Sequence, residues 1–255
     1  MSAGLDDAAL AAHLADYAGR ILLLVRDSGL FTGKALGKAG DQVANQFLIH
    51  ALREQRPDDG LLSEESQDTP DRLGKRRVWI IDPLDGTREY GEGRSDWAVH
   101  VALAIDGVPT VGAVALPGLD GGILLATDRA GPLPEAAARP RLAVSRTRPA
   151  AEALTVAEKL GAELVPMGSA GAKAMAVVRG DVDIYLHSGG QFEWDSAAPA
   201  AVALAHGLHA SRIDGAPLVY NQQDVAMPDL LICRKDMADS LLAACRNPHI
   251  GGKDA

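Results

Sequence analysis

A strand that runs directly into two closely spaced carboxylates constrains the fold more than any other stretch of this chain. Residues Val78 to Ile81 form a short apolar run, and Asp82 ends it. Pro83 fixes its own φ at about −65° and biases Asp82 toward an extended conformation. The step from Asp82 to Asp85 is therefore a stiff turn, and both carboxylates leave the end of one strand.

The residues that follow this turn suit an anion. Gly86 lets the backbone approach a ligand closely, and the amides of Gly86 and Thr87 can begin a helix whose positive end faces a phosphate. Carboxylates for a metal and amides for a phosphate would then meet within six residues. The alternative interpretation is structural, because Asp85 could simply cap the following helix.

Size and charge narrow the class of protein. The chain has 255 residues, 47% of them hydrophobic, which is enough for two packed subdomains that we place at 1–138 and 139–255. With 25 basic and 34 acidic residues the net charge is −9, which argues against a general nucleic-acid or membrane-surface binder. An acidic protein that handles a phosphate needs a cation between the two.

The lack of a recognisable signal peptide or membrane span and the cysteine usage together favour a cytoplasmic location. The N-terminus lacks the positive start of a signal peptide, and no apolar run approaches the ~18–20 residues of a membrane span. The two cysteines, Cys233 and Cys245, fall in an expected strand and an expected helix without CxxC spacing. They are best interpreted as small core residues in a reduced, cytoplasmic setting.

The first part of the chain combines helices with a loop. Residues 7–26 have the apolar spacing of an amphipathic helix, and the Gly- and Lys-rich residues 31–40 predict a mobile loop that could close over a site. A second helix is expected to begin near Asp41. Asp41 could then be only its N-cap, and Glu64 and Glu65 could be an ordinary solvated pair.

Strand patterns follow over residues 97–128. Apolar and other residues alternate there, and Asp106-Gly107 supplies a turn, so we expect an antiparallel meander. His100 is expected to be a packed strand residue and not a ligand. Residues 130–140 predict a linker.

Beyond the linker, strands and helices alternate, which is typical of a sheet covered by helices. The expected strands are 141–145, 163–166, 182–187, 212–220 and 229–233. The expected helices are 151–160, 170–179, a helix after 194–196 that runs to about 206, and 236–245. The HxxH pair at 206 and 209 has no neighbouring zinc-ligand pattern, and the tail 251–255 is expected to be disordered.

Four segments carry a resemblance to a known family: Asp41, Glu64-Glu65, Asp82–Thr87 and Trp194–Ala198. In this order and form they resemble the lithium-sensitive, magnesium-dependent phosphomonoesterase superfamily of inositol monophosphatase, fructose-1,6-bisphosphatase and the bisphosphate nucleotidases. The resemblance implies an α/β fold, a layered αβαβα sandwich of the sugar-phosphatase type with an α+β N-terminal part. It also implies a homodimer.

Further residues resemble one branch of this superfamily, the 3′(2′),5′-bisphosphate nucleotidases of sulfate assimilation. Residues 87–90, Thr-Arg-Glu-Tyr, are similar to that branch, as are residues 96–103 and 168–173. Ser188 stands where inositol-specific relatives place an acidic residue. Arg148 is a departure, because some nucleotidases carry a histidine there.

The chemistry of such a site follows from its carboxylates. Clustered carboxylates repel one another, and some would take up protons unless cations neutralise them. Oxygen-only ligands select a hard ion such as Mg²⁺ over zinc. Two ions about 3.5–4 Å apart can activate a water on one side of a phosphate and stabilise the leaving oxygen on the other.

The resemblance also implies how the ligands are shared. Glu64, Asp82 and the carbonyl of Leu84 would hold a first Mg²⁺, and Asp82, Asp85 and Asp195 would hold a second, so that Asp82 bridges the two.

Other residues would assist these ligands. Glu65 would interact with the metal ligands and not with the metal itself. A third, more weakly bound ion could lie near Glu64. Thr87 and Asp41 are similar to the pair that orients the attacking water, and Glu64 would take part in catalysis. The residues expected to contact the substrate are Asp85, Gly86, Thr87, Ser145, Gly168, Ser169, Lys173 and Asp195, with Lys173 reaching a second phosphate.

The resulting expectation is a phosphatase that removes the 3′-phosphate of adenosine 3′,5′-bisphosphate to give AMP and phosphate, with the 5′-phosphosulfate analogue as a second candidate substrate. It would use Mg²⁺ and be inhibited by Li⁺. Two alternatives stay open: an inositol or fructose bisphosphate phosphatase of broader specificity, and a metal-binding regulatory protein without turnover.

Overall fold

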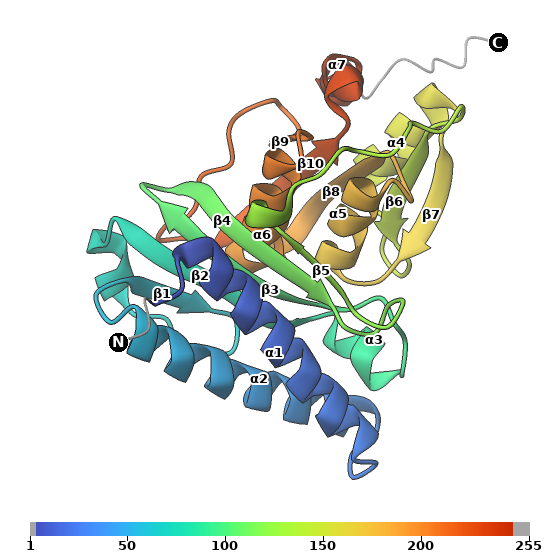
Figure 1. Ribbon diagram of the computed structural model, residues 1–255. Helices are drawn as coiled ribbons and strands as arrows, with labels where there is room; N and C mark the ends of the chain where they lie inside the picture. The colour runs from blue at the N-terminus through green and yellow to red at the C-terminus, as the bar shows by residue number, and fades with distance from the viewer. Residues whose placement is uncertain (1–3, 247–255) are drawn as a thin grey trace, which may run out of the picture.

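Two five-stranded sheets form the frame of the fold. The computed structural model describes residues 4–246 (Figure 1). The first sheet has the order β1-β2-β3-β4-β5, and the second has the order β7-β6-β8-β10-β9. The strands of the first are β1 (Gly60–Ser63), β2 (Arg77–Asp85), β3 (Ala98–Ile105), β4 (Val108–Leu116) and β5 (Ile123–Ala126). Those of the second are β6 (Arg141–Ser145), β7 (Glu163–Met167), β8 (Ile184–Phe192), β9 (His209–Ser211) and β10 (Ala226–Cys233).

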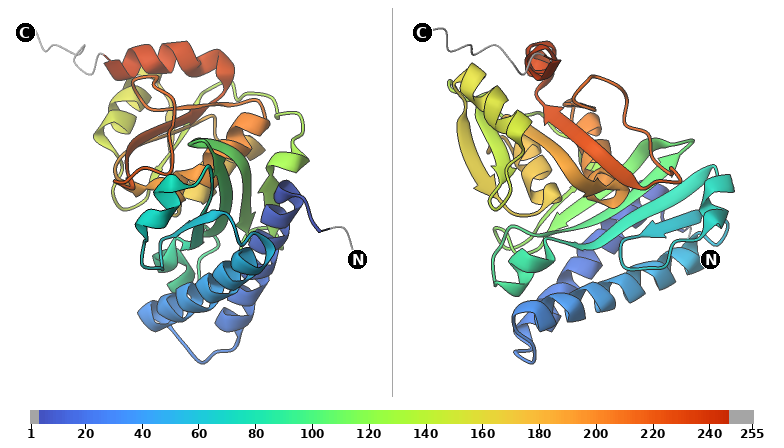
Figure 2. Two further views of the ribbon diagram at one scale, coloured as in Figure 1. Left: turned by 90° about the vertical axis from the view of Figure 1, so that its left-hand side faces the viewer. Right: turned by 180° about the vertical axis from the view of Figure 1, so that it is seen from behind.

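Helices form three layers that alternate with the two sheets (Figure 2). α1 (Asp7–Asp27) and α2 (Gly33–Gln55) cover the outer face of the first sheet, and α5 (Ala170–Arg179) and α6 (Glu193–Ala205) lie between the sheets. α4 (Ala151–Leu160) and α7 (Ala238–Arg246) cover the second sheet, while the short α3 (Thr87–Gly91) packs against α2. The predicted αβαβα sandwich is confirmed.

The alternation of side chains along β2 explains why this strand lies between two cores. Val78 and Ile80 belong to the central core shared with α5 and α6, whereas Trp79 and Ile81 belong to the outer core under α1 and α2. Successive residues of a strand point to opposite faces of the sheet. A strand segment with both faces covered is therefore continuously apolar, as residues 78–81 of β2 are.

Strand pairing matches the expected meander in the first sheet. β2, β3, β4 and β5 pair antiparallel in chain order, and β1 pairs with β2 in parallel. The second sheet is mixed, since β6 is parallel to β7 and β8, whereas β10 is antiparallel to β8 and β9. Residues 130–140 contain no helix or strand, as expected for a linker.

The predicted mobile loop at 31–40 is wrong for most of its length, because α2 begins at Gly33 and Asp41 lies inside the helix. Leu36 is buried there, and tertiary packing outweighs the low helix propensity of the glycines. A Cβ at Gly37 would lie 2.6 Å from Thr87 Cγ2, so a glycine lets α2 approach the turn after β2. The N-cap interpretation of Asp41 is wrong for the same reason.

The expected strand over 212–220 is also wrong. The chain instead forms β9 at His209–Ser211 and then a turn, in which Gly215 N–H donates to Arg212. Asp229 explains the change: its carboxylate accepts hydrogen bonds from the Arg212 side chain and the Ile213 amide. Conversely β8 extends to Phe192, five residues past the predicted end at 187. His249 and the tail 251–255 lie outside the described residues.

Within residues 4–246, α1 is the one helix long and apolar enough, by length and composition, to cross a membrane. Of its most apolar window 44% is buried inside the fold. Leu10, Leu14 and Leu22 of α1 belong to the outer core over the first sheet. The apolar composition of α1 is accounted for by this packing.

Candidate active site

Asp82 and Asp85 lie at the end of β2, where the strand leaves its regular pairing. The register between β2 and β3 shifts between these two residues. Asp82 is 1% exposed, and its Oδ1 accepts a hydrogen bond from the Leu84 amide at 3.0 Å. Gly86 follows with φ +89°, a left-handed conformation that favours glycine, and begins α3. The stiff turn expected from Pro83 thus holds both carboxylates at the strand end.

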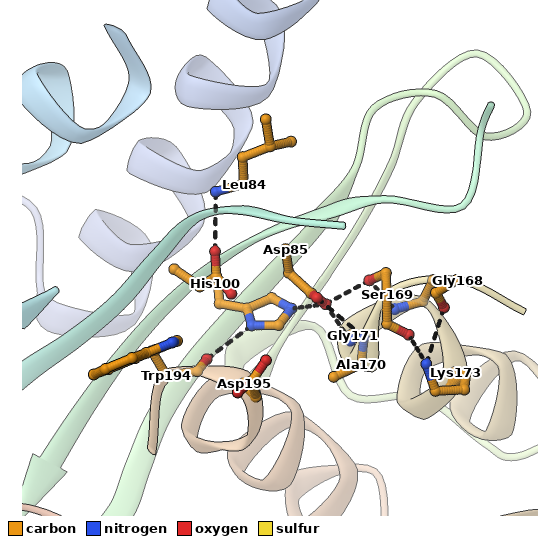
Figure 3. A network of polar contacts seen from close by, with 12 residues as sticks. Leu84, Asp85, His100, Gly168, Ser169, Ala170, Gly171, Lys173, Trp194 and Asp195 are labelled. Atoms are coloured by element: carbon orange, nitrogen blue, oxygen red, sulfur yellow. Dashed lines mark hydrogen bonds and ion pairs between the residues drawn. The ribbon is translucent and has the colours of Figure 1, made fainter. Parts of the chain in front are cut away.

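Asp85 does not cap the helix that follows it in sequence, because the N-cap of α3 is Gly86. Its carboxylate instead accepts hydrogen bonds from the first turn of α5, in the second half of the chain. Ala170 N–H donates to Oδ1 at 3.1 Å, and Gly171 N–H and the Ser169 hydroxyl donate to Oδ2 at 2.6 and 2.5 Å (Figure 3). An acid at a helix N-terminus is stabilised by the helix dipole.

Asp195 brings a third carboxylate to the same place. It lies in the first turn of α6, where its Oδ2 accepts a hydrogen bond from the Phe192 amide at 2.7 Å. One carboxylate oxygen from each of Asp82, Asp85 and Asp195 lies within 4.8 Å of the others. The three residues therefore converge, although 113 positions separate Asp82 from Asp195 in the sequence.

Glu64 stands beside this group, in the loop that follows β1. β1 runs parallel to β2, and the Glu64 amide donates to the carbonyl of Ile81 at 3.4 Å. The residue is exposed at the mouth of the site, but protein is dense around its carboxyl. Burial of the carboxyl and the neighbouring Asp85 raise the pKa of Glu64 to about 7.

The electrostatics of the cluster show strong mutual repulsion. Burial, followed by the charges of Glu64 and Asp85, raises the pKa of Asp82 well above its usual range. Burial and Asp85 raise the pKa of Asp195 to about 7. Burial also opposes ionisation of Asp85, but its contact with His100 and the bonds from Ser169 and Gly171 outweigh this and lower its pKa. A group of repelling oxygen ligands of this kind fits a hard divalent cation.

Thr87 and Asp41 meet on the other side of the turn. The Thr87 hydroxyl lies 3.4 Å from Asp41 Oδ1 and 3.2 Å from the carbonyl oxygen of Leu84. One hydroxyl hydrogen can serve only one of these acceptors at a time, which leaves room for a water in the network. Burial and the charge of Glu65 raise the pKa of Asp41 to about 7.

Two adjoining cavities contain nearly all of the residues that the sequence singled out. One of about 440 Å³ is lined by Glu64, Asp85, Gly86, Thr87, Ser145, Gly168, Ser169, Lys173 and Asp195, together with Arg146, Arg148 and His187. The other, of about 560 Å³, is lined by Asp41, Glu65 and Thr87, together with Lys34, Lys38 and Arg88. Thr87 borders both cavities.

Lys173 is almost fully enclosed at the edge of the cavity. It is 5% exposed, and its Nζ donates to the carbonyls of Gly168 and Ser169 at 3.1 and 2.5 Å. Burial lowers the pKa of Lys173. In this position it steadies the start of α5 while it also lines the cavity, and its contact with a second phosphate stays a prediction.

Sequence reasoning missed the contacts of His100 and of Arg146 near the site. His100 was expected only to pack in its strand, yet its Nε2 lies 3.3 Å from Asp85 Oδ2. Arg146 and Arg148 follow Ser145, and Arg146 forms ion pairs of 2.7 Å with Glu89 and with Glu92. Arg146 directly follows the predicted site serine, and this position was the signal that could have revealed its role.

A layered αβαβα fold whose carboxylates converge at the end of β2 is that of a metal-dependent phosphatase. The chain belongs to the inositol monophosphatase family, whose family model matches residues 12–249.

Within this family, the chain is similar to phosphatases that are named for nucleotide substrates. Over 260 aligned residues the chain is 52% identical to the 3′-phosphoadenosine 5′-phosphate phosphatase of Mycobacterium leprae. This alignment covers 96% of this chain and 95% of that protein. It is 32% identical over 198 residues to the 3′(2′),5′-bisphosphate nucleotidase CysQ of Escherichia coli, covering 73% and 80% of the two chains. The crystal structure of CysQ from Bacteroides thetaiotaomicron superposes with a TM-score of 0.76 at 25% identity, covering 90% of this chain and 97% of that one.

Proposed function

We propose that this chain hydrolyses the 3′-phosphate of adenosine 3′,5′-bisphosphate to give AMP and phosphate. The observation that carries the proposal is its 52% identity, over nearly the whole chain, to a relative with that named activity. The converging carboxylates of Asp82, Asp85 and Asp195 support the same chemistry. In the reaction a water oxygen bonds to phosphorus, the bond from phosphorus to the 3′ oxygen breaks, and that oxygen takes a proton.

The metal would be Mg²⁺, held by oxygen atoms alone. Glu64, Asp82 and the Leu84 carbonyl would hold one ion, and Asp82, Asp85 and Asp195 would hold a second, with a third possible near Glu64. Bound Mg²⁺ supplies positive charge that acidifies water and neutralises the phosphate oxygens. The raised pKa values of Asp82 and Asp195 support this assignment, because burial and then the neighbouring carboxylates oppose their ionisation, and a bound cation would offset both.

The remaining residues would orient the reactants. Thr87, which lies near both Asp41 and the Leu84 carbonyl, would accept a hydrogen bond from the attacking water while it donates its own hydrogen to Asp41, and so fix the direction of attack. The amides of Gly86 and Thr87 would bind the phosphate. Glu65 would support Asp41 and Glu64. Ser145, Gly168, Ser169 and Lys173 would surround the rest of the nucleotide.

A substrate panel with metal titration tests this function. We expect the highest kcat/KM for adenosine 3′,5′-bisphosphate, a lower value for its 5′-phosphosulfate analogue, and low values for inositol 1-phosphate and fructose 1,6-bisphosphate. Turnover should require Mg²⁺ and fall with added Li⁺. A preference for either sugar phosphate would overturn the substrate assignment, and background phosphate release at saturating Mg²⁺ would favour a regulatory protein.

Three further assignments belong to this proposal. A cytoplasmic location is supported by Cys233 and Cys245, which are both free. Subdomains at 1–138 and 139–255 are supported by the strands, because one sheet is built from residues 60–126 and the other from residues 141–233. A homodimer rests on the family resemblance, and light scattering of the purified protein would test it.

A further inference from the structure

His100 lies in the interior between two of the elements that carry the acidic side chains. It belongs to β3, faces the central layer and is 0% exposed. In the pairing of β2 with β3 it is the direct partner of Asp82. Its ring connects Asp85 at the end of β2 with Trp194 in the first turn of α6 (Figure 3).

The two ring nitrogens have different partners. Nδ1 lies 2.9 Å from the carbonyl oxygen of Trp194, and since a carbonyl can only accept, Nδ1 carries the hydrogen of this bond. Nε2 is thereby directed at Asp85 Oδ2, at 3.3 Å and without the alignment of a hydrogen bond; this contact is an ion pair when Nε2 carries a hydrogen as well. The ring is thus held by a hydrogen bond at Nδ1 and contacts Asp85 at Nε2.

Gly171 closes the remaining space around the ring. A Cβ at this position would lie 2.0 Å from His100 Nε2, which no side chain can tolerate. The amide of Gly171 meanwhile donates to Asp85 Oδ2 at 2.6 Å. The first turn of α5 can therefore hold Asp85 beside the imidazole only because residue 171 is glycine.

The two anchor points of His100 are adjacent to the residues that the site brings together. Trp194 directly precedes Asp195, so the carbonyl that His100 holds belongs to the same turn as that carboxylate. Asp85 is held by α5 on one side and by His100 on the other. His100 is thus the side chain that joins the end of β2 to the start of α6.

We propose that His100 is a positioning residue that fixes Asp85 relative to Asp195 and thereby sets the affinity of the site for a divalent cation. The inference rests on the proposed metal site but not on the identity of the nucleotide. Partners that orient carboxylate ligands commonly change metal affinity by about 10–100-fold when they are lost. The alternative is that His100 only fills space in the core.

Calorimetric titration of the chelator-treated protein with Mg²⁺ separates these two roles without any substrate. His100→Leu introduces an apolar side chain of similar size and loses both contacts, whereas His100→Gln keeps a donor group. We expect Mg²⁺ affinity to fall about 10–100-fold in His100→Leu and by an intermediate amount in His100→Gln. The KM for the nucleotide, measured at saturating Mg²⁺, should change less than twofold.

His206→Gln is the matched control, since Nδ1 of His206 also contacts a backbone carbonyl of α6, that of Val202 at 2.9 Å, at the opposite end of the helix. Its Mg²⁺ affinity should equal that of the unaltered chain.

If the His100 variants melt at a lower temperature in chelator but bind Mg²⁺ within twofold of the unaltered chain, the residue only packs and the inference is overturned. If His100→Leu does not fold, His100→Gln decides by the same comparison. If the unaltered chain itself shows no Mg²⁺ binding, the metal site fails together with this inference, whatever nucleotide it hydrolyses.

Discussion

The hydroxyl of Ser169 donates a 2.5 Å hydrogen bond to Asp85 Oδ2. The same oxygen of Ser169 accepts from the Ala172 amide and so caps α5. Ser169 has φ +46°, an uncommon conformation for a residue with a side chain, and the two bonds hold it there. The end of β2 and the start of α5, which come from different halves of the sequence, are therefore locked to one another at the site.

Replacing Asp82 should abolish turnover without unfolding the protein. Asp82→Asn removes the charge shared between the two ligand groups and keeps the size of the side chain. We expect kcat to fall by about 10³-fold or more, which corresponds to several kcal/mol of lost stabilisation of the transition state. In chelator the melting temperature should stay equal or rise, because one repelling carboxylate is gone. Retained activity would contradict the metal assignment.

The metal-free protein should become more stable as the pH falls from about 8 toward 5. The pKa values of Glu64 and Asp195 are about 7 in the folded chain, against about 4 in an unfolded one. Between these values the folded state binds more protons, so the free energy of unfolding increases as the pH falls from about 7 toward 4 and levels off above pH 7. Thermal melts in chelator across this range measure the effect. Saturating Mg²⁺ should flatten or reverse the slope; a slope unchanged by Mg²⁺ would contradict the site.

The hydroxyl of Thr87 should matter far more than its methyl group. Thr87→Val keeps the shape but loses the contacts with Asp41 and the Leu84 carbonyl, and kcat should fall about 10²–10⁴-fold, the usual range for a lost proton-transfer partner. Thr87→Ser is the matched control and should retain most of the activity. Steady-state kinetics at saturating Mg²⁺ measure both. Equal losses in the two variants would show that packing, and not the hydroxyl, is required.

Arg148 should contribute to recognition of the second phosphate of the substrate. Among residues 4–246 its guanidinium has no ion-pair partner, whereas the neighbouring Arg146 is neutralised by Glu89 and Glu92. Arg148→Ala should raise KM for adenosine 3′,5′-bisphosphate about tenfold, as expected for about 1.4 kcal/mol of binding energy. KM for 3′-AMP, which lacks the 5′-phosphate, should not change. An equal rise for both nucleotides would place the contact elsewhere.

The outline of the fold could be predicted because its signals are local. The apolar run of β2, the alternation in β3 and the strand–helix rhythm after residue 140 each depend on neighbouring residues. The start of α2 could not be predicted in this way, because Gly37 and Gly40 look like loop residues in the sequence but are required by the close approach of Thr87 and Tyr90 to the helix. Contacts between distant segments decide such cases.

The candidate site shows the same difference between local sequence signals and contacts of distant segments. Asp82, Asp85 and Asp195 were found from motifs whose residues are close in sequence, and the structure brings them together. The role of His100 could not be found, since it depends on the register of β2 with β3 and on the approach of α6. A histidine in an alternating strand carries no local sign of such partners.

The uninterrupted helix α2 has a consequence for how a nucleotide reaches the site. Residues 33–40 belong to a 23-residue helix, and Leu36 and Gly40 are buried against the rest of the fold. For this segment to swing as a flap, two helical turns would have to melt and a buried leucine would have to meet water. Lys34 and Lys38 therefore line the cavity from a rigid helix, and the shape of this entrance is formed before a ligand binds.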